Sequence, residues 1–326
     1  MPRIFGALLA LFVLFAGPSV HAADKPVIRV GVLKFGTVNW ELDVIRHHTL
    51  DAAEGVEVEI VELAGNPATQ VALQGGAVDM IVTDWLWVSR QRTQGADYTF
   101  IPYSTAVGKV MVPVGSPIAS LGDLKGRKLG IAGSPLDKGW LMLRALMLQD
   151  YGFDPDTATE RMFGAPPLLN EQIRSGSLDA VLNYWHFAAR LQAAGLRPLI
   201  GIDEVTRKLG ITTDVPIIGY VFSEQWAARQ PKAVEGFARA SIAAKKIMQD
   251  SDAEWQRLRP LTQAEGDATL LALRDGYRDG IPTAWGDAER ADAAKVFAIL
   301  AKIGGSELIG NADRLAPGTF WNGLKF

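Results

Sequence analysis

The apolar and polar positions of the chain alternate between short strand-like runs and longer helical stretches. Residues 27–33 and 78–82 are largely apolar, as in strands buried on both faces, whereas 55–63 alternates apolar residues with glutamate like a half-exposed strand. Helical patterns lie between these runs, one over 40–50 and one over 66–76 that opens with Asn-Pro and closes with Gly-Gly. This alternation predicts an α/β architecture built on parallel strands.

The order of elements changes after these first units. Two strand-like segments, 100–104 and 109–114, have little room for a helix between them, so the second is expected to run antiparallel or to leave the first sheet. A new strand–helix series begins at 124–133, and an apolar strand over 216–222 precedes a helical remainder. The elements expected within the new series are helices over 137–150, 168–175 and 184–194 and a strand over 178–183.

This order predicts two lobes that the chain visits as first, second, first. Each lobe is expected to be a doubly wound sheet covered by helices, with a hinge and a cleft between the two. The expected parts are a signal segment at 1–22, the first lobe at 23–108, the second lobe at 109–217, and a return to the first lobe with C-terminal helices at 218–326.

The N-terminal segment is typical of a secretory signal. Arg3 supplies a positive charge, 4–16 is almost continuously apolar, and small residues lead to an expected cleavage after Ala22. The alternative is an uncleaved anchor, but about 13 apolar residues fall short of the ~20 that span a bilayer. No cysteine follows the apolar run, which excludes a lipid-anchored lipoprotein. We therefore expect a soluble protein in the periplasm.

Composition removes several classes of function. The chain has no cysteine, which excludes disulfides, thiolate metal sites and cysteine nucleophiles. Its net charge is −3 with scattered basic residues, so no nucleic acid or membrane surface is expected as a partner. Common hydrolase, metalloprotease and phosphate-loop motifs are missing, and the adjacent His47 and His48 point about 100° apart on a helix. We predict no metal, no cofactor and no enzymatic activity.

Four strand-to-helix loops carry the candidate chemistry. The loops 34–41, 83–87, 133–138 and 183–186 each combine a small or hydroxyl residue with an aromatic or charged one. Helix N-termini with Ser or Thr bind anions, and Trp and Tyr cover an apolar body or a cation. The candidate ligand-binding residues are Phe35, Gly36, Thr37, Asn39, Trp40, Thr83, Asp84, Trp85, Gly133, Ser134, Asn183, Tyr184 and Trp185.

A purely structural interpretation stays open for several of these residues. Thr83, Ser134 and Asn183 have the side chains of helix N-caps, which contribute about 1 kcal/mol each. Trp85 and Trp185 have the size of core or interlobe packing residues, since aromatic side chains dominate burial. The sequence does not choose between these roles and ligand contact.

Asp84 is the most specific candidate. A carboxylate at a strand end beside an indole repels an anion but pairs with an ammonium or a ring N–H. The alternative is a carboxylate cap for the following helix. Asp137 and Lys138, at the start of another helix, are interpreted as a solvent-exposed pair.

Three phrases carry a resemblance to a known family. The segments 73–81, 120–134 and 223–237 are similar to periplasmic solute-binding proteins of the nitrate/sulfonate/taurine (SsuA-like) and thiamine-precursor (NMT1/THI5-like) family. The resemblance covers nearly the whole mature chain. It implies a two-lobed, type II-like binding-protein fold, and its site residues correspond here to Gly36-Thr37, Thr83-Asp84-Trp85 and Gly133-Ser134.

The resemblance also implies a function and partners. It implies capture of a small organic solute (sulfonate- or taurine-like, an amine or a heterocycle) by lobe closure, and delivery by a monomer to an ABC permease in the inner membrane. Asp84 and Trp85 depart from the simplest sulfonate-binding pattern and disfavour inorganic nitrate. The alternative function is a periplasmic sensor that docks on a receptor. An exported enzyme is disfavoured, because the family's pyrimidine synthases use a cysteine-rich segment that this chain lacks.

Overall fold

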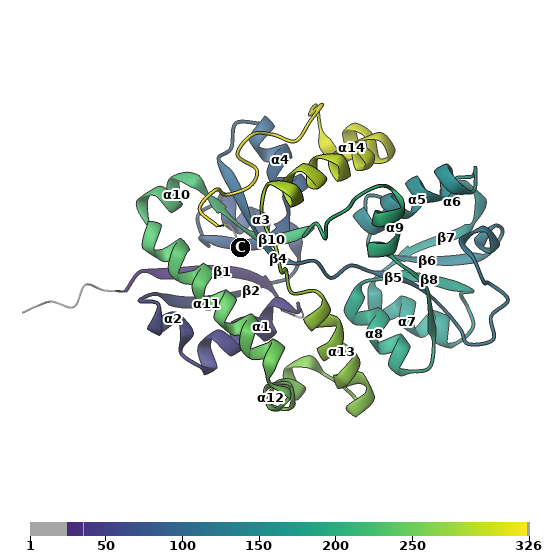
Figure 1. Cartoon of the computed structure of the whole chain (residues 1–326), viewed down its shortest axis with the longest axis horizontal. Helices are drawn as coiled ribbons and strands as arrows, with labels where there is room; N and C mark the ends of the chain where they lie inside the picture. The colour runs from purple at the N-terminus through teal and green to yellow at the C-terminus, as the bar shows by residue number, and fades with distance from the viewer. Residues whose placement is uncertain (1–24, 35, 325–326) are drawn as a thin grey trace, which may run out of the picture.

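The computed structural model describes residues 25–34 and 36–324, so the expected signal segment and its cleavage site after Ala22 lie outside the described residues. The described chain forms two lobes side by side, each built on a five-stranded sheet flanked by helices (Figure 1). This two-lobed arrangement confirms the α/β fold class expected from the sequence. Within the described ranges, the structure has no helix whose length and apolar character would let it cross a membrane.

The two sheets repeat one spatial order of strands. The first sheet runs β2 (Glu57–Leu63), β1 (Val27–Leu33), β3 (Met80–Asp84), β10 (Ile218–Ser223) and β4 (Tyr98–Ser104). The second runs β7 (Glu160–Gly164), β6 (Lys128–Ala132), β8 (Ala180–Asn183), β5 (Lys109–Val112) and β9 (Arg197–Gly201). In each sheet the first three strands are parallel, and the fourth is antiparallel to both of its neighbours.

The antiparallel strand in each sheet is the strand by which the chain arrives from the other lobe. Strand β5 follows β4 directly yet belongs to the second sheet, and β10 returns to the first sheet after β9. The segment 109–114 therefore leaves the first sheet and also runs antiparallel in its new one. Strand β5 ends at Val112, because Pro113 has no N–H to donate. Two linkers, 105–108 and 209–217, thus join the lobes.

Helices cover both sheets and continue beyond the last strand. Those that precede β10 are α1 (Val38–His47), α2 (Leu50–Ala53), α3 (Asn66–Gln74), α4 (Trp85–Thr93), α5 (Lys138–Asp150), α6 (Pro155–Ala158), α7 (Pro166–Arg174), α8 (Trp185–Ala193) and α9 (Ile202–Lys208). Those that follow β10 are α10 (Glu224–Arg229), α11 (Pro231–Asp250), α12 (Asp252–Thr262), α13 (Asp267–Asp279) and α14 (Asp287–Ile309). A short 3-10 helix covers Leu121–Leu124.

Several elements differ from the expectations. The helix expected over 40–50 ends at His47, and a short separate helix, α2, begins at Leu50, because Thr49 between them adopts a left-handed conformation with φ of 52°. Strands β7 and β9, helices α2, α6 and α9 and the 3-10 helix were not expected at all. Both missed strands lie at sheet edges, where one row of backbone N–H and C=O groups has no partner strand and polar residues are tolerated. Strand β9 even contains Pro198, a residue that sheets accept mainly at their edges.

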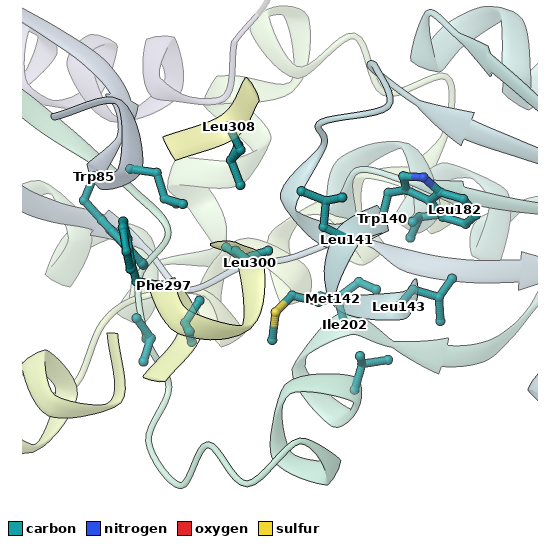
Figure 2. Close-up of a cluster of buried hydrophobic side chains, with 14 of the residues drawn as sticks. Trp85, Trp140, Leu141, Met142, Leu143, Leu182, Ile202, Phe297, Leu300 and Leu308 are labelled. Atoms are coloured by element: carbon teal, nitrogen blue, oxygen red, sulfur yellow. The ribbon is translucent and has the colours of Figure 1, made fainter. Parts of the chain in front are cut away.

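The C-terminal helices connect the lobes. Helix α13 packs on α8 and helix α14 packs on α5, so the return segment contacts the second lobe on two sides of the linkers (Figure 1). In the second contact, Phe297, Leu300 and Leu308 of α14 belong to the same buried apolar cluster as Leu141 and Met142 of α5 (Figure 2). A continuous core therefore extends from one lobe into the other.

Candidate ligand-binding site

A cavity of about 360 Å³ lies between the lobes. The ends of β1 and β3 and the start of α1 line it from the first lobe, and the ends of β6 and β8 with the starts of α5 and α8 line it from the second. Both linkers, α9 and part of α14 complete the walls. Ligands in open α/β sheets bind at the carboxyl ends of strands, so the cavity lies where this fold places a ligand.

Most of the wall is apolar. Valine, leucine, isoleucine and methionine side chains from both lobes line it, among them Val32, Val82, Met142, Leu182 and Ile218. Small pockets with apolar walls and a few convergent polar groups are typical of binding sites for small organic molecules. The polar groups therefore decide which head group the site accepts.

An ion pair between the lobes is one polar feature of the cavity, and Arg207, which pairs with Asp203 and Asp214, is another. Asp84 ends β3 and caps α4, its Oδ1 accepting the Trp87 N–H at 2.9 Å, while its Oδ2 lies 2.7 Å from Lys138 Nζ at the start of α5. Burial lowers the pKa of Lys138, but the charge and hydrogen bond of Asp84 outweigh it and raise the pKa overall. Lys138 is therefore an ammonium. The interpretation of Asp137 and Lys138 as a solvent-exposed pair is wrong, because Lys138 reaches across to the first lobe.

Asp137 brings a second carboxylate to the same point. It lines the cavity and caps α5, its Oδ1 accepting the Trp140 N–H at 3.1 Å. Burial raises the pKa of Asp137, and Asp84 raises it further, against the opposing effect of Lys138. Two carboxylates thus lie beside one ammonium at the polar end of the cavity.

In the first loop, some residues line the cavity and another holds the loop in place by hydrogen bonds. Gly36 and Thr37 line the cavity, and Phe35 lies outside the described residues. Asn39 supports the loop, since its amide donates to the carbonyl oxygens of Leu33 and Lys34 at 3.0 and 3.1 Å. A glycine and a hydroxyl residue therefore remain as the contacts that this loop offers.

Two of the predicted tryptophans pack within the protein. Trp40 is buried and meets Trp185 of the other lobe edge-to-face, with ring centroids 6.0 Å apart. Trp85 is fully buried in the cluster of Figure 2, and its Nε1 donates to the Pro216 carbonyl at 2.9 Å. Neither lines the cavity, whereas Thr83 next to Asp84 does. For Trp40 and Trp85 the structure favours the packing role that the sequence left open for such residues.

Gly133 and Ser134 line a neighbouring space of about 320 Å³. This space shares Asp84, Lys138 and Tyr184 with the first cavity, so the ion pair lies between the two. Gly133 has φ of 92°, and a Cβ there would lie 2.7 Å from the Tyr184 hydroxyl, so only glycine fits.

The loop after β8 contributes one structural residue and two wall residues. Asn183 is buried, and its amide donates to Asn170 Oδ1 at 2.8 Å and to the Pro166 carbonyl at 3.0 Å while its Oδ1 accepts the Tyr184 N–H. Protein groups thus satisfy its amide although it borders the cavity. Tyr184 and Trp185 line the cavity with their side chains at the start of α8.

His186 is a cavity residue that the candidate set missed. It lines the first cavity, and its Nδ1 is buried without a hydrogen-bond partner among the described residues. Burial, with a smaller effect of Arg190, lowers its pKa to about 3, so the imidazole is neutral. The available signal in the sequence was its position next to Trp185 at the expected helix start. The described residues hold no cluster of acidic or histidine side chains suited to a metal ion.

The sequence profile described as NMT1/THI5 like matches residues 52–254, more than half of the chain. The chain belongs to the NMT1/THI5-like family. The matched region runs from α2 through the whole second lobe and into α12, so it includes the loops that carry Asp84, Lys138 and Tyr184 but not β1, α1 or the loop between them. A comparison with curated protein sequences finds no match.

Solved structures share the fold of this NMT1/THI5-like protein at low sequence identity. The periplasmic aliphatic sulphonate binding protein SsuA from Escherichia coli matches with a TM-score of 0.72 and 16% identity, over 92% of this chain and 93% of its own. The alkanesulfonate-binding protein SsuA from Xanthomonas axonopodis pv. citri, bound to MOPS, matches with a TM-score of 0.68 and 16% identity over 92% and 99%. The desulfurization enzyme DSZB also matches, with a TM-score of 0.58 and 14% identity over 86% and 93%. The fold therefore occurs in both binding proteins and an enzyme.

Proposed function

We propose that the protein is the solute-binding component of an ABC importer, and that it works in the periplasm after cleavage behind Ala22. Family membership, the two-lobed fold and a cavity with walls from both lobes support this role. We assign 23–108 and 218–326 to the first lobe and 109–217 to the second, so that the lobe boundaries fall beside the two linkers.

The proposed mechanism is capture by closure. A solute that contacts both lobes stabilises the closed form by the contacts it makes only there. Asp84 and Lys138 come from opposite lobes and meet at the cavity, so polar groups from both sides are already aimed at one point. The closed protein then delivers the solute to a permease in the inner membrane.

The charges at that point carry the proposal about the solute. Lys138 is already paired with Asp84, and Asp137 adds a second, half-buried carboxylate beside them. A carboxylate that is partly withdrawn from water and shares its nearest cation with another carboxylate is costly, and a ligand that brings positive charge or hydrogen-bond donors reduces that cost. We infer a small solute with an apolar body and a head that carries an ammonium or ring N–H group, including zwitterions such as taurine.

A thermal-shift screen of the mature chain tests this function. The probes are choline, imidazole, taurine, ethanesulfonate and nitrate. A ligand at 100 times its Kd stabilises the folded state by about 2.7 kcal/mol, which a shift in Tm reveals. We expect shifts with probes that carry an ammonium or ring N–H group, followed by titration calorimetry of the best one.

The screen separates the two parts of the proposal. Stabilisation by ethanesulfonate or nitrate, with none by the probes that carry an ammonium or ring N–H group, would contradict the inferred head group while keeping solute binding. Failure of every probe, extended to a library of small polar metabolites, would contradict the binding function itself. Loss of uptake of the identified solute in cells that lack this chain then tests delivery to a permease.

A further inference from the structure

A buried carboxylate in the first lobe joins four elements. Glu41 of α1 is fully buried, and its Oε1 accepts hydrogen bonds from the hydroxyls of Tyr220 on β10 (2.9 Å) and Ser241 on α11 (2.5 Å). Its Oε2 accepts from Lys245 Nζ on α11 (2.5 Å) and from the hydroxyl of Tyr277 on α13 (3.0 Å). One side chain therefore holds α1, β10, α11 and α13 together.

A buried carboxylate–ammonium pair contributes little to the free energy of unfolding. Removing a carboxylate and an ammonium from water carries a desolvation penalty that their attraction often fails to repay, and apolar residues of similar size frequently stabilise a core as well. The protein nevertheless surrounds the pair with polar and aromatic partners: the Lys245 ammonium lies 4.9 Å from the centre of the Tyr103 ring. A buried ion pair with this many partners favours one arrangement of α1, β10, α11 and α13. It therefore sets the distances between these elements.

The network borders the cavity on the side of the first lobe. Thr37 lines the cavity and lies four residues before Glu41, on the same side of α1. The hydroxyl of Tyr103 lies 3.5 Å from Thr37 Oγ1, and Tyr103 is also the ring beneath Lys245. The start of α1 at the cavity is thus attached to the same group of side chains as the Glu41 carboxylate.

The network also reaches the wall that belongs to the second lobe. Tyr277 lies on α13, which packs on α8, and the ring of Trp185 at the start of α8 is 6.5 Å from the Tyr277 ring. The preceding Gly276 lets the helix approach, since a Cβ there would lie 3.0 Å from Trp185 Cε3. Trp185 itself lines the cavity. The hydroxyl of Tyr277 therefore links Glu41 to α13, the helix that packs against Trp185.

We propose that Glu41 is a positioning residue of the solute site: through Tyr277 its buried carboxylate holds α13 in register with α1, and so sets the spacing between the cavity wall at Thr37 and the wall at Trp185. This inference rests on the proposed solute-binding function for its purpose, but the spacing it describes exists without a solute. Glu41 does not line the cavity and acts only through the residues that it holds.

Two tyrosine variants form a matched test. Tyr277→Phe and Tyr220→Phe each delete one hydroxyl that donates to the same carboxylate, and each keeps its ring. Only Tyr277 lies on the helix that packs on the second lobe, because Tyr220 is on a strand inside the first sheet. The chain has no cysteine, so Glu59→Cys and Glu160→Cys, at exposed positions on β2 and β7, allow spin labels to be placed in the two lobes.

The measurement is the distribution of distances between the labels, recorded without solute. Both variants are expected to lower Tm by similar amounts, because they lose equivalent hydrogen bonds. Only Tyr277→Phe is expected to broaden the distribution and shift it to longer distances. An unchanged distribution in Tyr277→Phe, or an equal change in Tyr220→Phe, would overturn the inference.

A second readout links the spacing to binding. Titration calorimetry with the best probe of the thermal-shift screen should show weaker binding by Tyr277→Phe than by Tyr220→Phe, while equal affinities of the two variants would overturn the positioning role. The distance measurement needs no solute. The inference can thus fail while solute binding stands, and solute binding can fail while the spacing effect is observed.

Discussion

Glu41 and His186 are both polar groups held away from water, yet the protein satisfies one and leaves the other open. Glu41 accepts four hydrogen bonds from protein side chains inside the first lobe. His186 Nδ1, at the cavity between the lobes, has no hydrogen-bond partner among the described residues. Buried polar groups normally have a hydrogen-bond partner, either in the protein or in ordered water. The comparison separates a carboxylate whose partners all come from the protein from an imidazole nitrogen for which the described residues supply none.

The Lys245–Glu41 pair, which is buried, and the Lys138–Asp84 pair, which is partly exposed, show the same contrast. Burial lowers the pKa of Lys245 even though Glu41 opposes the shift, whereas for Lys138 the effect of Asp84 outweighs burial and the pKa is raised. The first pair lies inside a closed core, and the second lies where two lobes meet around a cavity. An ion pair of similar length therefore has different consequences depending on what surrounds it.

The largest expected effect comes from removing the satisfied carboxylate. Glu41→Ala leaves the Lys245 ammonium buried and unpaired, which should lower the free energy of unfolding by about 3–5 kcal/mol. Urea denaturation measures this change. The control is Lys246→Ala, which removes an exposed pair with Asp250 and should change stability by about 0.5 kcal/mol or less. If Glu41→Ala and Lys246→Ala lowered the free energy of unfolding by a similar small amount, the buried carboxylate would not stabilise the lobe more than an exposed ion pair does.

At the cavity, affinity should change more than stability. Asp84→Asn keeps a cap for α4 but removes the charge, so stability should change by about 1 kcal/mol or less while the affinity for the best ammonium or ring N–H probe falls about tenfold, or about 1.4 kcal/mol. Titration calorimetry measures the affinity. Asp179→Asn is the control, because that carboxylate accepts the Lys128 N–H outside the cavity. Equal affinity of the Asp84 variant and the parent would contradict the assignment of the head-group site.

Because burial holds the imidazole of His186 neutral, the free energy of unfolding should fall as the pH falls. The pKa of His186 is lowered from 6.5 to about 3, so between these values the unfolded chain binds more protons and stability falls as the pH falls. From pH 7.5 to 5.5 this contributes a loss of about 1.4 kcal/mol, which His186→Gln should remove from the denaturation curves. His47→Gln, which replaces an exposed histidine outside the cavity, is the control variant. A parent and His186 variant with identical pH profiles would show that the imidazole is not held neutral.

The smallest effect is expected in the neighbouring space. Ser134 is exposed, and its Oγ accepts only a 3.3 Å hydrogen bond from the Leu136 N–H within the described chain. Ser134→Ala should change stability by about 0.5 kcal/mol or less and leave probe affinity unchanged. A clear loss of affinity in calorimetry would instead extend the solute site beyond the Asp84–Lys138 pair into this space.

The pattern of the chain predicted much of the fold. The apolar run at 27–33 and the alternation within 57–63 have the period of strands, and the short interval between 104 and 109 leaves no room for a crossover helix. Strands β7 and β9 were missed because each has only five residues, opens with charged or proline residues and shows no clear alternation, whereas β2, also at a sheet edge, alternates over seven residues.

The candidate site was predicted at the level of loops rather than of side chains. The loops that carry Thr37, Asp84 and Tyr184 do meet at one cavity, because strand ends of each sheet face the space between the lobes. Asn183 and Trp85 look equally suitable in the sequence, yet protein groups satisfy the amide of one and the core encloses the other. Residue type identifies what a side chain can bind but not what already binds it.

By itself, the sequence determined the α/β class, the absence of disulfides and the strand-end loops that hold the chemistry, because these depend on periodicity and on residue type within short segments. Only the tertiary structure decided that Lys138 neutralises Asp84 across the lobes and that Tyr277 is tethered to Glu41. These partners are 54 and 236 residues apart in the chain, so their contacts depend on how two lobes and a returning helix pack. The periodicity and residue types of short segments do not determine that packing.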